Sequence, residues 1–69
     1  MNRLLSASDT AERLRMRKDV VLKMLEDGEI PASRMGKMWR VDEEQLHEWF
    51  KARAAKEADA RRKNNGEDN

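Results

Sequence analysis

The stretch "RMGKMWR" runs from Arg34 to Arg40 and combines three cations, two methionines, a glycine and a tryptophan. In a chain of 69 residues a tryptophan is expected to pack on the core. Trp39, however, lies among cations, which normally avoid the core. A β-hairpin resolves this conflict, because alternate side chains of a strand point to opposite faces. We therefore predict a hairpin over residues 32–41, with one face on a small core and the other offering positive charge to a polyanion.

Two registers of this hairpin fit the sequence. A two-residue loop at positions 36–37 pairs Met35 with Met38 and places Arg34 beside Trp39 on the inner face. A loop one residue longer pairs Met35 with Trp39, and it alone separates apolar from charged side chains. Three-residue loops with glycine are common, so we expect this longer loop. The inner face then carries Ser33, Met35, Trp39 and Val41, and the outer face carries Arg34 and Arg40, with Lys37 at the tip.

The first part of the chain predicts two short helices. The first is expected to begin at Ser6, because Asp9 follows at the spacing of a capping box. The second is expected from about Lys18 to Gly28, where glycine favours the left-handed residue that closes a helix. Residues 15–17 would then form a tight connection, so the pair is a helix-turn-helix candidate.

A third helix is expected after the hairpin, where Asp42 and Gln45 again have the spacing of a capping box. Beyond Phe50 the only apolar residues are alanines, so we expect the helix to outrun the core and to fray near Arg61. The last residues, "NNGEDN", are expected to be disordered. The predicted division is a domain over residues 1–53, a helical extension over 54–63 and a disordered tail over 64–69.

The expected fold class is mainly α with a small β-hairpin. A core of this size supplies only about 3–5 kcal/mol, and methionine suits such a small, irregular interior. The predicted core consists of Leu5, Ala11, Leu14, Met16, Val21, Met24, Leu25, Ile30, Met35, Trp39, Val41, Leu46, Trp49 and Phe50.

The composition argues against several classes of function. The absence of cysteine excludes disulfides and thiolate zinc sites. No apolar run approaches the ~20 residues of a membrane span, and the start does not resemble a signal peptide. We expect a cytoplasmic protein with no membrane partner. His47 is the single histidine, and with Glu43 alone it makes no metal site, so we expect a surface histidine. We find no catalytic set and expect no enzyme, no cofactor and no metal.

The net charge is only +1, but the charges are segregated along the chain. Basic clusters lie at residues 13–18 and 32–41, and an acidic block without Lys or Arg follows at residues 42–50. A nearly neutral sum built from such blocks can present a positive face to nucleic acid. The alternative is that these charges are ordinary solvated faces of helices.

The order of helix, helix, hairpin and helix resembles a known family. The stretch "LLSASDTAERLRMRKDVVLKMLEDGEIPASRMGKMWRVDEEQLHEWF", residues 4–50, resembles the excisionase-type winged helix-turn-helix domains, relatives of the MerR DNA-binding domain. The most specific pieces are "DGEIPASRMGKMWRVDEEQLHEW" and the spacing from Ala11 and Glu12 to Gly28. The resemblance implies a second helix in the major groove with the hairpin, or wing, beside it. Two positions differ from the family's usual pattern. Arg15 stands where a glycine is common, and Arg17 stands where a Ser or Thr commonly caps the second helix.

The resemblance also implies candidate DNA contacts. In the second helix they are Arg17, Lys18, Asp19 and Lys23, and Lys18 is best placed to reach base edges. Asp19 either accepts from a cytosine amino group or only favours the helix N-terminus. In the wing the candidates are Arg34, Lys37 and Arg40, which would contact phosphate or the minor groove; an alternative for Arg40 is an ion pair with an acid of the third helix. Val20 and Leu22 take positions where polar base contacts are usual, so they are expected to be exposed.

We therefore expect a sequence-specific protein that binds double-stranded DNA. The resemblance favours an excisionase, that is, a recombination directionality factor of a phage or mobile element that bends DNA and assists an integrase. One alternative is a small MerR-like transcriptional regulator. Another is a protein-interaction module that uses Val20, Leu22 or the third helix. The expected partners are double-stranded DNA, an integrase and neighbouring copies of the protein on DNA.

Overall fold

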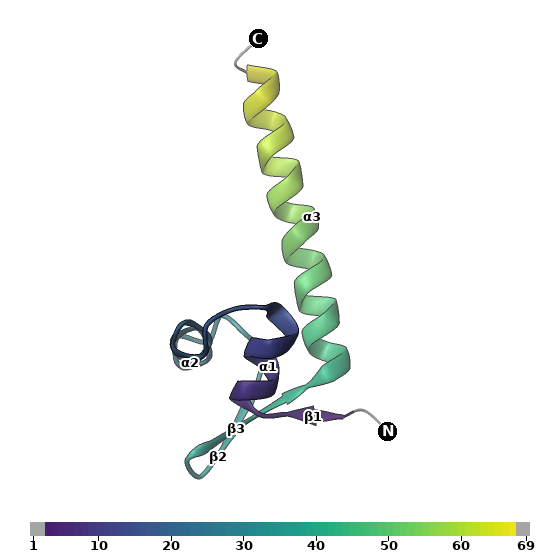
Figure 1. The fold of residues 1–69 in the computed structure, drawn as a ribbon. Helices are drawn as coiled ribbons and strands as arrows, with labels where there is room; N and C mark the ends of the chain where they lie inside the picture. Colours follow the sequence, from purple (N-terminus) through teal and green to yellow (C-terminus); the bar gives the residue numbers. More distant parts are fainter. Residues whose placement is uncertain (1–2, 68–69) are drawn as a thin grey trace.

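The computed structural model describes residues 3–67, with side chains up to Lys63. Its elements form a three-stranded antiparallel sheet of order β1-β3-β2 and three helices (Figure 1). The predicted mainly helical winged helix-turn-helix architecture is confirmed. The elements are β1 Leu4–Leu5, α1 Ala7–Leu14, α2 Lys18–Glu26, β2 Ser33–Met35, β3 Met38–Asp42 and α3 Glu43–Glu67.

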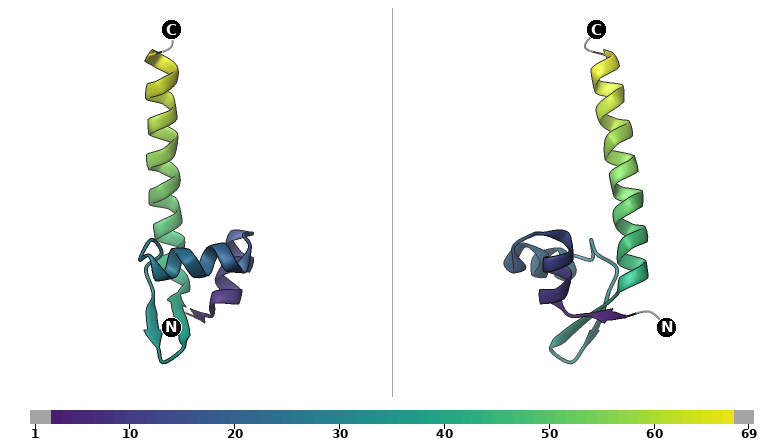
Figure 2. Two further views of the ribbon diagram at one scale, coloured as in Figure 1. Left: turned by 90° about the vertical axis from the view of Figure 1, so that its left-hand side faces the viewer. Right: turned by 45° about the vertical axis from the view of Figure 1, so that its right-hand side comes forward.

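Two parts of the chain project from the packed body. The β2–β3 hairpin, called the wing from here on, extends in one direction, and α3 rises in the other (Figure 2). Residues 50–63 of α3 are all exposed. The body that joins them consists of α1, α2, the sheet and the first turns of α3.

The start of α1 is fixed by the predicted capping box. The Ser6 hydroxyl accepts a hydrogen bond from the Asp9 N–H at 3.1 Å, and the Asp9 carboxylate accepts one from the Ser6 N–H at 3.2 Å. The backbone N–H of Ser6, followed by its hydroxyl, holds the pKa of Asp9 below its ordinary value of 3.8. The cap therefore contributes stability above pH 3.8, and this contribution is lost as the pH falls through the lower folded-state pKa.

The end of α1 carries backbone strain. The Arg15 N–H donates to the Glu12 carbonyl at 3.2 Å and the Met16 N–H to the Ala11 carbonyl at 2.9 Å, which is the Schellman pattern of a helix end. This pattern requires a left-handed residue, and Arg15 adopts φ 54° and ψ 47°. A residue with a Cβ pays about 1–2 kcal/mol for this conformation. Gly28, at φ 79°, closes α2 without that cost.

The register of the wing differs from the prediction. The loop has two residues, and the paired residues are Met35 with Met38 and Arg34 with Trp39. Gly36 is at φ 66°, and the next residue is not in the positive-φ region, which fits the type II′ turn of a two-residue hairpin. The expected three-residue loop is therefore wrong.

The shorter loop brings one arginine onto the inner face. Arg34 shares a face with Trp39, and its Cζ lies 5.5 Å from the centre of the Trp39 ring. A guanidinium over an indole is attracted by the negative face of the ring, a cation–π contact of about 0.5–1 kcal/mol at exposed sites. The separation of apolar from charged residues, which favoured the longer loop, was therefore a poor criterion. Arg34 and Arg40, which were expected to share the outer face, lie on opposite faces of the wing.

The sheet also contains a strand that the sequence analysis missed. β1 pairs with β3, with Leu4 opposite Asp42 and Leu5 opposite Val41. Leu5 and Val41 are completely buried, so this pairing anchors the wing to the core. The side chain of Asp42 then accepts from the Glu44 N–H at 3.0 Å, which confirms it as the cap of α3.

The core is smaller and more aliphatic than predicted. Three predicted members are exposed: Met16 by 38%, Met35 by 66% and Phe50 by 52%. Met35 is outside because of the changed register, and Phe50 because α3 is leaving the body there. Leu22 was expected to be exposed, but it packs against the core and is half-buried. The buried apolar residues are Leu5, Ala7, Ala11, Val21, Leu25, Ile30, Val41 and Leu46.

α3 is longer than predicted. The helix continues past Arg61 to Glu67, whereas fraying was expected near Arg61 and disorder was expected for residues 64–67. Residues 68 and 69 lie outside the described residues. Ion pairs one turn apart, such as Arg53 with Glu57 and Lys63 with Asp59, support an exposed helix of this kind. The proposed boundary between domain and extension at residues 53–54 stays a prediction.

The strain at Arg15 predicts that Arg15→Gly stabilises the protein. Relief of about 1–2 kcal/mol outweighs the added unfolded-state entropy of glycine, about 0.5–1 kcal/mol. The expected net gain is about 0.5–1 kcal/mol, which raises Tm by roughly 2–8 °C in a domain of this size. Thermal unfolding followed by circular dichroism measures the change.

The matched control is Gly28→Ala at the end of α2. No atom lies within 4 Å of the added Cβ, so its loss of stability reports the left-handed backbone alone. If Arg15→Gly lowered Tm while Gly28→Ala also lowered it, strain at Arg15 would be refuted.

Candidate nucleic-acid interface

A positively charged groove lies between the start of α2 and the wing. It has a volume of about 290 Å³, and its cations are Lys18 from α2 and Lys37 and Arg40 from the wing. Among the described residues that line this groove, none is acidic. Three of the seven predicted contact residues thus meet at one place, although they are far apart in the sequence.

The first turn of α1 also borders this groove, through Ser6, Ala7 and Ser8. The N-terminal end of a helix presents backbone N–H groups and carries a partial positive charge. An anion in the groove would therefore meet a helix terminus as well as the cations. This contribution could not be predicted from the sequence, because it depends on how α1 packs beside the wing.

The apolar side of the groove is formed by Leu22 and Trp39, and Met38 lines it from the wing. Trp39 is half-buried and packs against the core, so it fixes the wing beside α2. Trp39 and Met38 were not among the predicted site residues. Their place follows from the register, which the sequence pattern did not decide.

Arg40 is held at the edge of the groove by its own strand. Its Nη1 donates to the Trp39 carbonyl at 3.0 Å, and its Nη2 lies 3.7 Å from the Met38 sulfur. Within the described part of α3, no carboxylate forms an ion pair with Arg40; Glu43, for example, pairs with Arg13. The role of Arg40 therefore stays a prediction.

The remaining predicted residues lie outside this groove. At the start of α2, Arg17 Nη2 lies 3.0 Å from Asp19 Oδ2, and both side chains are exposed. Arg17 occupies the cap position of α2 without a side-chain cap hydrogen bond. Such an exposed pair contributes about 0–1 kcal/mol, so Arg17 can exchange the carboxylate for another anion at small cost. Lys23 is exposed further along α2, and Arg34 lies over Trp39 on the wing.

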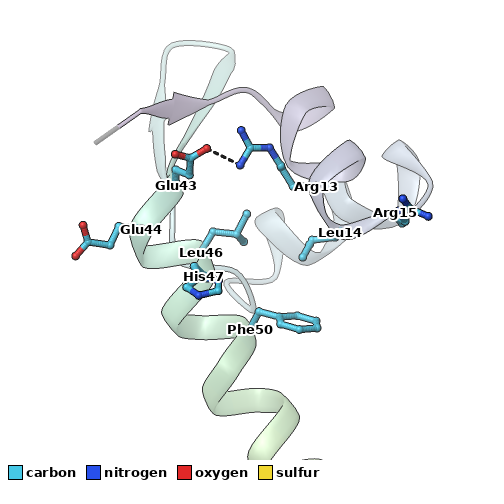
Figure 3. Close-up of a pocket in the computed structure, with 8 residues that line it drawn as sticks. All are labelled: Arg13, Leu14, Arg15, Glu43, Glu44, Leu46, His47 and Phe50. Atoms are coloured by element: carbon cyan, nitrogen blue, oxygen red, sulfur yellow. Dashed lines mark ion pairs between the residues drawn. The ribbon is translucent and has the colours of Figure 1, made fainter. Parts of the chain in front are cut away.

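A larger cavity, of about 660 Å³, lies elsewhere, between α1 and the first turns of α3. Figure 3 shows Arg13 reaching across to the carboxylate of Glu43, with Leu46 and Phe50 below this ion pair. His47 is exposed at its border, as predicted. The cavity brings together no nucleophile and base, and we assign it no chemistry.

Two further observations bear on the class of site. Among the described residues there is no group of three His, Cys, Asp or Glu side chains that could hold a metal ion. No helix in the described part of the chain is long and apolar enough to cross a membrane.

Comparison with known proteins assigns a family to most of the chain. A family model for a helix-turn-helix domain matches residues 4–54. This range includes α1, α2, the sheet and the base of α3. No curated protein and no solved structure matches the chain.

Proposed function

Because the chain belongs to the helix-turn-helix domain family, we propose that it binds double-stranded DNA sequence-specifically, with α2 in the major groove and the wing beside it. The groove between α2 and the wing carries this proposal. Lys18, Lys37 and Arg40 line it, and none of the described residues that line it is acidic. A DNA backbone strand carries regularly spaced negative charge and suits such a groove.

The two walls of the groove would have different roles. Lys18 is at the N-terminal end of α2, and the N-terminal residues of a recognition helix contact base edges. Lys37 is at the tip of the wing, where it would contact phosphate, which positions the protein but carries no sequence information. Arg17, with Asp19 beside it, would contact the backbone at the edge of the major groove. Lys23 and Arg34 are secondary candidates.

Within DNA binding, we propose the role of an excisionase that bends DNA and assists an integrase. The resemblance of residues 4–50 supports this role, and so does the small reading surface of one copy. Val20 and the half-buried Leu22 are apolar where base readout is expected, so one copy reads few bases. Neighbouring copies on DNA or an integrase would supply the missing specificity.

Apolar surface at the base of α3 would serve such protein contacts. A groove of about 390 Å³ there is lined in part by Met16, Trp49 and Phe50. It lies on the side of α3 that faces α2 and the turn before it, away from the wing. A MerR-like regulator remains the second candidate, because the same domain resemblance supports it. We place the protein on DNA in the cytoplasm in either case.

The different roles of Lys18 and Lys37 predict different binding defects. Lys37→Ala should weaken binding to every duplex alike and lower the slope of log affinity against log salt by roughly one unit. Lys18→Ala should cost about 1–3 kcal/mol on the preferred site and much less on scrambled DNA. Titrations at several salt concentrations, with preferred and scrambled duplexes, measure both effects.

Lys56→Ala on the exposed part of α3 is the control, because it removes the same charge as the two lysine variants, and Lys56 lines neither the groove beside the wing nor the groove at the base of α3. If the two lysine variants lost affinity equally on both DNAs, α2 would contact only phosphate and would not read the base sequence. If wild-type protein bound no duplex with salt-dependent affinity, DNA binding itself would be refuted.

The excisionase role predicts that the protein promotes excision by an integrase. A reaction reconstituted from an integrase, its attachment-site DNA and this protein should give excised product only when all three are present. Lys37→Ala should reduce the yield in parallel with its loss of DNA affinity. DNA binding that changes transcription of a reporter but never supports excision would favour the regulator.

A further inference from the structure

The tip of the wing exposes two methionines that packing does not explain. Met35 and Met38 are directly paired and flank the two-residue turn, so their side chains lie on one face of the wing. Their exposed fractions are 66% and 55%. The opposite face holds Arg34 and Trp39 and turns to the body. The wing points away from α3 (Figure 2), and its tip therefore presents an apolar pair.

The charges around this pair favour a polyanion as its partner. Lys37 lies between the two methionines in the turn, and Arg40 approaches the sulfur of Met38 at 3.7 Å on the same face. Met38 also lines the groove that contains Lys18. The partner therefore has both a negatively charged edge and an apolar interior, which is the character of a DNA groove.

The geometry indicates which DNA groove this would be, given the DNA binding proposed above. A single backbone strand forms the ridge between the major and the minor groove of a duplex. If that strand lies between α2 and the wing, with α2 on its major-groove side, then the tip of the wing lies on its minor-groove side. The methionines would then face the floor of the minor groove, where the base pairs stack.

We propose that Met35 and Met38 form an apolar wedge that enters the minor groove, opens a base step and bends the duplex. Apolar side chains, methionine among them, unstack base steps from the minor groove in this way and bend DNA toward the major groove. The unbranched, flexible thioether chains adapt to the irregular edge of an opened step. Lys37 and Arg40 would hold the flanking phosphates while the step opens.

The wedge also gives the protein a source of sequence preference. Pyrimidine–purine steps unstack more easily than others, so the energy needed to open the step depends on sequence without any base-edge hydrogen bond. This indirect readout would compensate for the apolar residues on α2. Specificity at the wedge would therefore follow DNA deformability.

The test compares bending with affinity in two variants. A double variant, Met35→Ala with Met38→Ala, should keep the wild-type Tm, because both side chains are exposed. Its bend angle, measured by energy transfer between the ends of a short duplex, should fall to less than half of the wild-type angle. Lys37→Ala is the matched control at the same tip, and it should bind more weakly but bend the bound DNA as the wild type does.

A duplex with one mismatched step at the centre of the site provides a second readout. A mismatched step needs less energy to unstack, so the wild type should bind the mismatched duplex about fivefold or more tightly than the matched duplex. The double variant should bind the two duplexes with equal affinity. If the double variant bent DNA as strongly as the wild type, or retained the preference for the mismatch, the wedge would be excluded.

Oxidation by hydrogen peroxide, read by mass spectrometry, locates the contact. A duplex long enough for only one copy should slow sulfoxide formation at Met35 and Met38, whereas Met16, 38% exposed in the groove at the base of α3, serves as the internal control. Protection that appears without DNA and increases with protein concentration would assign the pair to a contact between copies and overturn the proposal. If the wild type bound no duplex at all, the proposed function would fail first; wild-type binding without a bend would overturn the wedge alone.

Discussion

The turn at Gly36 is the constraint on which the geometry of the interface depends. Its positive φ of 66° permits a two-residue loop, and the loop length fixes every cross-strand pair of the wing. A shift by one residue would move Trp39 away from its partner Arg34 and bring Met35 opposite it. With the observed register, Trp39 holds the wing against the core and Lys37 stands at the tip. The cationic groove beside α2 therefore follows from one glycine.

The helix-turn-helix unit gives up stability near its charged surface. Arg15 occupies a left-handed position that glycine would take at lower cost, and Arg17 caps α2 without a side-chain hydrogen bond. Arg17 places positive charge at the start of α2, where a polyanion would lie, whereas Arg15 lines the cavity between α1 and α3. The weak cap thus occurs where the proposed interface needs a cation, and the strain lies in the turn before it. The described residues include eight buried apolar side chains, and in a core of this size such losses are a noticeable part of the total stability.

The sequence predicted the elements well wherever the signal was local. Ser6 with Asp9, and Gly28 at the end of α2, are short-range signals that act within one helical turn, and both appear as expected. The register could not be predicted in the same way, because both loop lengths are common and the contact of Arg34 with Trp39 breaks the rule that separates apolar from charged residues. β1 was missed because a two-residue strand has no periodicity. The groove was missed as a unit because only tertiary packing joins α1, α2 and the wing.

The most direct test of this account is the nuclear Overhauser spectrum of the free, isotopically labelled protein. The observed register predicts contacts between the side-chain protons of Arg34 and the indole of Trp39, and upfield ring-current shifts of those Arg34 protons. It also predicts cross-strand contacts between Met35 and Met38. Contacts between Met35 and the Trp39 indole, with Arg34 at ordinary shifts, would establish the three-residue loop and contradict the account.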